Sequence, residues 1–207
     1  MDHSKPLFEV GLRLVIAWLV LSLIGFVCRE QLAAHCLPLI HGALAVIAPQ
    51  FSGSLSLLTE HDQPQILFDA HVGLPIAVGA ELVIPFGQAL PASTSVIHAL
   101  VPFVLLFSVM LAWPLRGWKA SVALMTLAIP TATLLLVLTT PFQLLGLIEV
   151  AIQSYANAQH AGRSEPFSLS WMLFLEGGGL WVLPLVLATV CATVAQTVGS
   201  QRTARKI

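Results

Sequence analysis

Four long apolar stretches dominate this chain of 207 residues and limit the folds that it can adopt. A helix needs about 20 apolar residues to cross the hydrocarbon core of a bilayer. Hydrophobic residues make up 57% of the chain and charged residues only 9%, against about 25% charged residues in a soluble domain. We therefore expect an integral membrane, mainly α-helical protein built as a four-span transmembrane helix bundle. The expected spans are residues 7–27, 96–113, 120–140 and 171–194.

The segment between the first two expected spans, residues 28–95, has a different pattern. Gln31 to Ala48 is only moderately apolar and contains Pro38, which favours a helix at the membrane interface over a span. Beyond it, alternating polar and apolar residues predict strands at residues 54–57 and 65–72, and a third strand at residues 76–84. We expect a small extracytoplasmic β-rich insertion in a chain that otherwise forms a single membrane domain, residues 1–207.

The links between the later spans are shorter. Ser93, Thr94 and Ser95 offer an N-cap for the second span. The third span is expected to continue as an amphipathic helix to about Tyr155, and a polar loop is expected at residues 157–170.

Lysine and arginine set the expected orientation, because cytoplasmic segments carry an excess of both. The chain has nine of these residues. If the N-terminus is cytoplasmic, only Arg29 and Arg163 fall outside. The others fall inside: Lys5, Arg13, Arg116, Lys119, Arg202, Arg205 and Lys206. We predict a multi-pass membrane protein with cytoplasmic N- and C-termini.

The last expected span holds the candidate interface. Glu176 is an ionisable group inside an apolar segment, which by default suggests function. Three glycines follow it and leave one side of a helical turn without side chains, so another helix can approach closely. Local unwinding is the alternative. The expected packing or partner interface comprises Glu176, Gly177, Gly178, Gly179, Trp181 and Pro184. Glu176 is also the one candidate for a catalytic group.

Histidine is distributed unevenly in this topology, because only His3 falls inside. Imidazole and carboxylate ligands suit zinc, copper or iron. His61 and His71 lie near acidic residues and are the candidate metal ligands. However, if a hairpin turns about Gln63, His71 pairs near Leu55 and lies far from His61. We therefore expect no metal site and predict no cofactor.

The three cysteines fit neither a disulfide framework nor a zinc-binding spacing. A bridge between Cys28 and Cys36 requires a break between them, because eight helical residues would separate them by about 12 Å. The sequence leaves this bridge open.

In layout the chain resembles the exosortase H-associated membrane protein family. The points of contact are an N-terminal span containing Trp18, an outer β-rich segment leading into residues 68–75, and proline-rich spans. The final span, with Glu-Gly-Gly-Gly-Leu-Trp-Val-Leu-Pro, completes the resemblance. The resemblance implies an accessory protein of a bacterial inner-membrane system that sorts and anchors exported proteins. It assigns no functional residue.

The sequence leaves three functions open. The first is a non-catalytic accessory or scaffold subunit of an assembly in the bacterial inner (cytoplasmic) membrane. Its expected partners are the lipid bilayer and another membrane protein. The second is a membrane enzyme with an outer-leaflet site around Glu176 and the outer histidines. The third is a small transporter subunit, although the second and third spans offer no charge to meet Glu176. A net charge of −1 gives no attraction to nucleic acid, so we expect no nucleic-acid partner.

Overall fold

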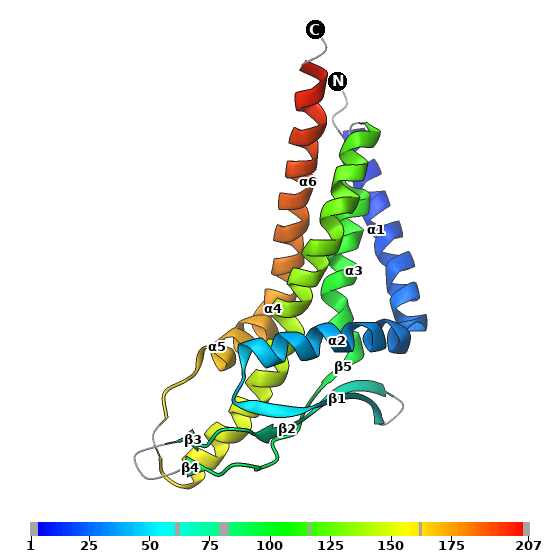
Figure 1. Cartoon of the computed structure of the whole chain (residues 1–207). Coiled ribbons are helices and arrows are strands. Elements are labelled where there is room, and N and C mark those ends of the chain that lie inside the picture. Colours follow the sequence, from blue (N-terminus) through cyan, green and yellow to red (C-terminus); the bar gives the residue numbers. More distant parts are fainter. Residues whose placement is uncertain (1–3, 61–62, 79–82, 116, 162, 205–207) are drawn as a thin grey trace. The chain divides into compact units, whose positions relative to one another are not determined.

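The computed structural model describes residues 4–60, 63–78, 83–115, 117–161 and 163–204, and Figure 1 shows the order of the elements. The helices are α1 (Ser4–Val27), α2 (Arg29–Ile47), α3 (Val96–Ala112), α4 (Trp118–Ala158), α5 (Phe167–Phe174), the π-helical turn η1 (Leu175–Gly179) and α6 (Leu180–Ala204). The strands are β1 (Phe51–Glu60), β2 (Gln63–Val72), β3 (Ile76–Ala77), β4 (Val83–Ile84) and β5 (Ala92–Ser95).

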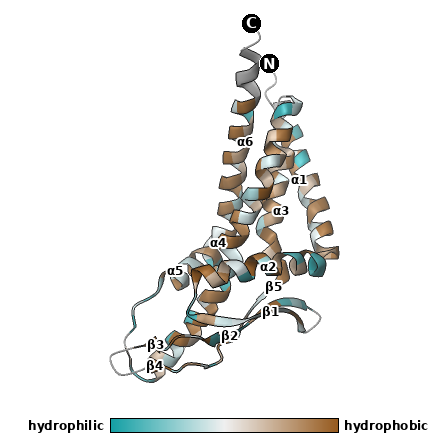
Figure 2. Cartoon of the chain, in the orientation of Figure 1, coloured by the Kyte–Doolittle hydropathy of each residue, from teal (hydrophilic) through white to brown (hydrophobic). Residues whose placement is uncertain are grey.

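Four helical stretches in the described residues are long and apolar enough to cross a membrane: Phe8–Val27, Arg29–Ile47, Trp118–Ala158 and Phe167–Val198. Figure 2 shows hydrophobic residues along most of α1, α3 and α6. The expectation of a mainly helical chain with four such stretches and a small β-rich segment is confirmed at this level. The four stretches differ from the expected spans, because α2 qualifies by composition whereas α3 has only 17 residues.

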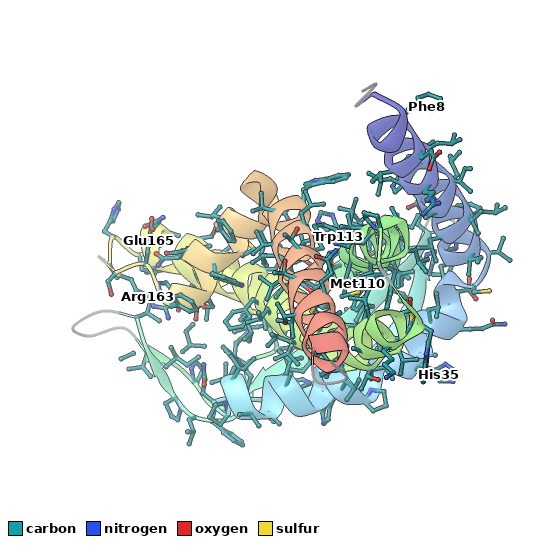
Figure 3. All side chains as sticks on the ribbon, turned by 90° about the horizontal axis from the view of Figure 1, so that it is seen from above. Phe8, His35, Met110, Trp113, Arg163 and Glu165 are labelled. Atoms are coloured by element: carbon teal, nitrogen blue, oxygen red, sulfur yellow. The ribbon has the colours of Figure 1, made fainter. Side chains whose placement is uncertain are left out.

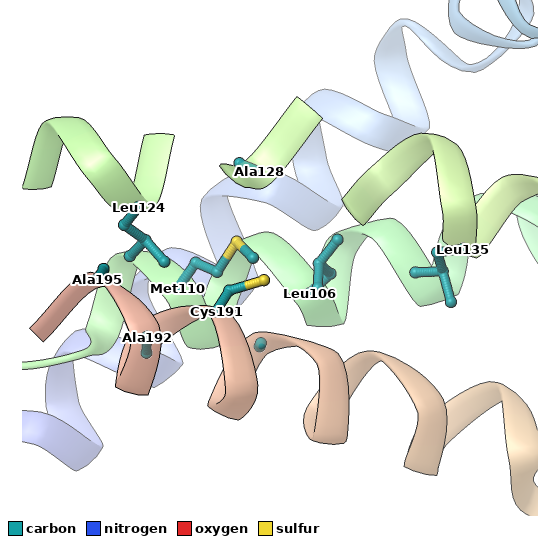
Figure 4. Packing of buried hydrophobic residues seen from close by; sticks show 9 residues of the cluster. Leu106, Met110, Leu124, Ala128, Leu135, Cys191, Ala192 and Ala195 are labelled. Atoms are coloured by element: carbon teal, nitrogen blue, oxygen red, sulfur yellow. The ribbon is translucent and has the colours of Figure 1, made fainter. Parts of the chain in front are cut away.

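Contacts divide the chain into two compact units, and the first comprises Met1–Val27, Leu100–Leu135 and Leu180–Ile207. Its core lies between α3, the first part of α4 and α6 (Figure 4). The buried residues are Leu106, Met110, Leu124, Ala128, Leu135, Ala188, Cys191, Ala192 and Ala195. The alanines allow the helices to approach closely, as is typical of helix packing in membranes.

Successive helical segments of this first unit run in alternating directions (Figure 1). The start of α1, the link between α3 and α4, and the end of α6 therefore lie at the same end of the unit. Near the other end, a Cβ placed on Gly25 would lie 3.6 Å from Cγ2 of Val104.

The second unit comprises Cys28–Ala99 and Leu136–Gly179. Its sheet has the order β1-β2-β5, with both pairs antiparallel. Inward-facing residues of β2 alternate with outward-facing ones and bury Ile66, Phe68, Ala70 and Val72. The β1–β2 hairpin confirms the alternation read from the sequence. His71 pairs with Ser52, because the hairpin places Glu60 opposite Gln63.

Helix α2 packs against β1 and β2 in this unit. It buries Ala33, Ile40 and Leu44, which share one helix face. All three cysteines are free, and an unbroken helix runs from Arg29 past Cys36. The structure therefore contains no Cys28–Cys36 bridge.

One local prediction is wrong. Residues 76–84 do not form one strand, because β3 and β4 pair with each other as the two arms of a short antiparallel ladder. Residues 93–95, expected to offer a cap for the next helix, belong to β5. This strand occupies the free edge of β2 by pairing Ala92 with Phe68 and Ser95 with Gln65. Because α3 begins directly after this strand, it cannot start earlier.

Helix α4 is one helix of 41 residues and contributes to both units. The predicted continuation beyond the third span is confirmed, since the helix runs to Ala158. The expected polar loop at residues 157–170 is shorter, because α5 already begins at Phe167.

Candidate functional site

The last apolar helix is interrupted between α5 and α6. Residues Leu175–Gly179 form a π-helical turn in which Gly178 has φ 126° and ψ −7°. Side-chain-bearing residues rarely adopt this conformation, so glycine is required at this position. A Cβ on Gly177 or Gly178 would meet no described atom within 4 Å. No other helix in the described part of the chain approaches these two glycines closely, and the alternative, a local departure from the α-helix, is present. The interface with a partner stays a prediction.

Gly179 has a different role from its two neighbours. A Cβ at this position would lie 2.6 Å from Cε1 of Phe174, so the phenyl ring occupies the place of a side chain. The glycine thus permits packing between the two sides of the break. Its contact partner is a residue of the same segment and not a separate helix.

Glu176 projects from the π-helical turn, and its side chain is half exposed, with 50% of its surface accessible. Its Oε1 atom accepts a hydrogen bond of 3.4 Å from Nε2 of Gln143. The same oxygen lies 3.5 Å from Nε2 of His98. The second and third spans were expected to offer no charge to meet Glu176, and the group that meets it is the imidazole of His98, the third residue of α3.

The sheet fixes the position of His98. Strand β5 pairs with β2 and continues directly into α3, so the first turn of α3 is tied to the sheet. Gln143 comes from the second part of α4 and is only 2% exposed. The cluster of His98, Gln143 and Glu176, which we call the polar cluster, lies within the second unit.

Three buried polar atoms of this region lack a hydrogen-bond partner in the described part of the chain: His98 Nε2, Thr140 Oγ1 and Gln143 Oε1. Thr140 is fully buried and lies three residues before Gln143, on the same face of α4. An unsatisfied buried polar group costs about 1–3 kcal/mol. Each such unpaired group needs an explanation, which is a bound water or ion or a functional role.

Aromatic packing holds α5 against α4. Phe142, Phe167 and Trp171 form edge-to-face and stacked pairs with centroid separations of 5.8–6.2 Å. The indole Nε1 of Trp171 donates a hydrogen bond of 2.8 Å to the carbonyl of Leu138. Gly146 allows the closest approach, since a Cβ there would lie 2.5 Å from Sδ of Met172. These contacts fix the end of α5 and therefore the position of Glu176.

An ion pair connects the loop before α5 to helix α4. Arg163 Nη1 donates to Glu149 Oε2 over 2.5 Å, and the side chains are 16% and 8% exposed. Gln153 Nε2 also donates to the carbonyl of Ser164 over 3.3 Å. Figure 3 shows Arg163 and Glu165 on this loop. The pair links the end of α4 to the chain that enters α5.

The remaining predicted site residues lie elsewhere. Trp181 is 55% exposed and Pro184 is buried, and both belong to the first unit. His71 Nε2 lies 3.7 Å from Asp69 Oδ1 on β2, whereas His61 lies outside the described residues. No group of three histidine, cysteine, aspartate or glutamate side chains is placed to hold a metal ion in the ranges that the structure describes.

Sequence reasoning identified Glu176 and the histidines expected outside but missed Gln143. A usable signal was present, because Gln143 is an amide within the apolar helix α4. Chemically, the polar cluster offers a carboxylate, an imidazole and an amide, which can exchange protons or bind a donor or a cation.

Comparison of the chain with protein-family models, with curated proteins and with solved structures gave no match.

Proposed function

We propose that this chain is a multi-pass membrane protein that acts as a non-catalytic accessory or scaffold subunit of a membrane assembly. The observation that supports this most is the half-exposed carboxylate of Glu176 beside Gly177 and Gly178, where an added Cβ would meet no described atom within 4 Å. Near the membrane boundary, contact of an uncovered carboxylate with acyl chains would cost several kcal/mol. A polar protein surface is therefore a better neighbour for this break than an acyl chain.

The proposed spans are α1, α3, the first part of α4, and α6 with the end of α5. Helix α2 is apolar enough to cross, but it packs against an open three-stranded sheet. Open sheet edges do not occur in hydrocarbon, because their backbone groups would lack hydrogen bonds. We therefore place α2 at the membrane surface, with the sheet on its extracytoplasmic side.

Helix lengths support a position of the polar cluster near the outer boundary. At about 1.5 Å per residue, 20 residues cover the roughly 30 Å hydrocarbon core. Counting 20 residues back from Arg202, at the basic end of α6, brings this boundary to Val182, which leaves Glu176 just outside the hydrocarbon. Counting 20 residues forward from Lys119 brings it to Thr139, which leaves Gln143 just outside as well. The second part of α4 then extends beyond the hydrocarbon.

The orientation follows from the basic residues. The start of α1, the α3–α4 link and the end of α6 lie at one end of the first unit, and the sequence places most lysines and arginines in these segments. The positive-inside rule then supports cytoplasmic N- and C-termini. The resemblance in layout given above supports the bacterial inner membrane and an exosortase-type protein-sorting assembly as the setting.

Co-purification in mild detergent tests the accessory function. We expect the tagged chain to elute as a stable heteromeric complex. Gly177→Leu should disrupt the complex, because the new side chain enters space that this chain leaves open and that the partner would occupy. Gly11→Leu, at an equally open position on α1, is the matched control and should retain the complex. A monomer, or equal complex formation by both variants, contradicts the proposal.

Reporter fusions test the topology separately. A periplasmic reporter placed after Gln63 should be active, whereas one placed after Gly117 should be inactive. The reverse pattern would invert the proposed orientation.

A membrane enzyme is the second candidate, because His98 Nε2 lies 3.5 Å from Glu176 Oε1. An imidazole near a carboxylate can act in general acid–base catalysis. Glu176→Gln separates the two functions. Loss of an activity with intact assembly favours the enzyme, whereas loss of the complex favours the scaffold.

A further inference from the structure

The polar cluster is rich in hydrogen-bond acceptors that have no donor. Gln143 Oε1 can only accept, and it is buried without a partner among the described residues. Glu176 contributes a carboxylate with further lone pairs, and His98 Nε2 is a second buried atom without a hydrogen-bond partner in the part of the chain described. An occupant of this cluster must therefore supply donors or positive charge.

The existing contact between the amide and the carboxylate is weak. Its length of 3.4 Å exceeds the 2.7–3.2 Å that is typical of N–H···O hydrogen bonds. Rotation of the Gln143 amide by half a turn exchanges its nitrogen and oxygen positions. That rotation breaks this weak bond, moves the amide nitrogen to the buried position where the oxygen had no partner, and brings a carbonyl oxygen toward Glu176.

The distances from Glu176 Oε1 to His98 and to Gln143 match those between ligands around one metal ion. Tetrahedral zinc has bonds of about 2.0–2.2 Å to nitrogen and oxygen, which places neighbouring ligand atoms roughly 3.3–3.6 Å apart. His98 Nε2 lies 3.5 Å from Glu176 Oε1, and the terminal amide atom of Gln143 nearest to that oxygen lies at 3.4 Å. Both separations fall within this range.

We propose that His98, Glu176 and Gln143 bind one divalent transition-metal ion. Imidazole nitrogen with carboxylate and amide oxygen suits zinc, manganese or iron better than calcium or magnesium, which prefer oxygen ligands alone. The unpaired hydroxyl of Thr140, one turn before Gln143, is the remaining polar group on this face of α4. The ion would supply the positive charge that this acceptor-rich cluster lacks. The inference is independent of the proposed partner.

Metal titration of the full chain in mild detergent tests this site. After treatment with a chelator, the protein is titrated with Co²⁺, whose visible absorption reports tetrahedral coordination, and then with Zn²⁺ as a competitor. We expect one ion per chain. His98→Ala and Glu176→Gln should each weaken binding at least tenfold, because each removes one of three ligands.

The matched control is His71→Ala, which removes another histidine that lies beside an acid, on β2. It should leave the affinity unchanged. If Glu176→Gln fails to fold, as judged by thermal unfolding without metal, His98→Asn provides the test alone. Absence of saturable Co²⁺ uptake, or uptake that is equal in the wild-type chain and the ligand variants, overturns the metal site and leaves water as the occupant. Partner co-purification by metal-free protein would still support the scaffold function.

Discussion

Removal of the Glu149 carboxylate should destabilise the second unit. Glu149→Ala leaves the guanidinium of Arg163, only 16% exposed, without its anionic partner. Breaking a fully buried ion pair from one side costs about 3–5 kcal/mol. Because part of Arg163 reaches solvent, we expect a smaller loss of about 2–3 kcal/mol, which is roughly a 30- to 150-fold change in the folding equilibrium.

The loss can be measured by equilibrium unfolding of the purified protein in mild detergent titrated with a denaturing detergent. Limited proteolysis of residues 159–166 should become faster in parallel, because the ion pair ties this loop to α4. Glu165→Ala is the control, since Glu165 lies on the same loop and is exposed. It should change the free energy of unfolding by less than about 0.5 kcal/mol.

A double substitution distinguishes the cost of losing the ion pair from the cost of leaving one buried charge without a partner. Glu149→Leu with Arg163→Met replaces both charges by apolar groups of similar size, so it should recover most of the stability lost in Glu149→Leu alone. The reasoning is refuted if Glu149→Ala is no more destabilising than Glu165→Ala, or if the double variant is as unstable as the single one.

Two further predictions concern the glycines, and both use the same unfolding measurement. Gly178→Ala should cost about 1–3 kcal/mol, because alanine is strained at φ 126°, whereas Gly42→Ala in the open face of α2 should be neutral or stabilising. Equal changes in the free energy of unfolding for the two substitutions would contradict the helix break at Gly178. Gly146→Ala should lower the free energy of unfolding by about 1–3 kcal/mol, because the new methyl group clashes with Met172. Adding Met172→Ala should relieve that clash. If the losses of stability in the two single variants simply add in the double variant, this contact is ruled out.

Local sequence patterns determined a large part of this fold. Apolar runs predicted α1, α3 and α6, and strict alternation predicted β1 and β2, because helix and strand periodicities depend only on neighbouring residues. Ser93–Ser95 show the limit of such local information. Serine and threonine suit a helix cap as well as a strand, and only the free edge of β2 showed that these residues form β5.

Glu176 and its glycines illustrate the limit of sequence reasoning. The sequence by itself determined that an ionisable group and a flexible backbone occur together in an apolar helix, since this follows from residue identity. It could not determine that the helix breaks there, nor that Gln143, 33 residues earlier, would donate to the carboxylate. Those outcomes depend on how α5 packs against α4 and on how the sheet holds the start of α3. Only the tertiary structure decides such contacts, because the packing of distant segments sets which side chains share one site.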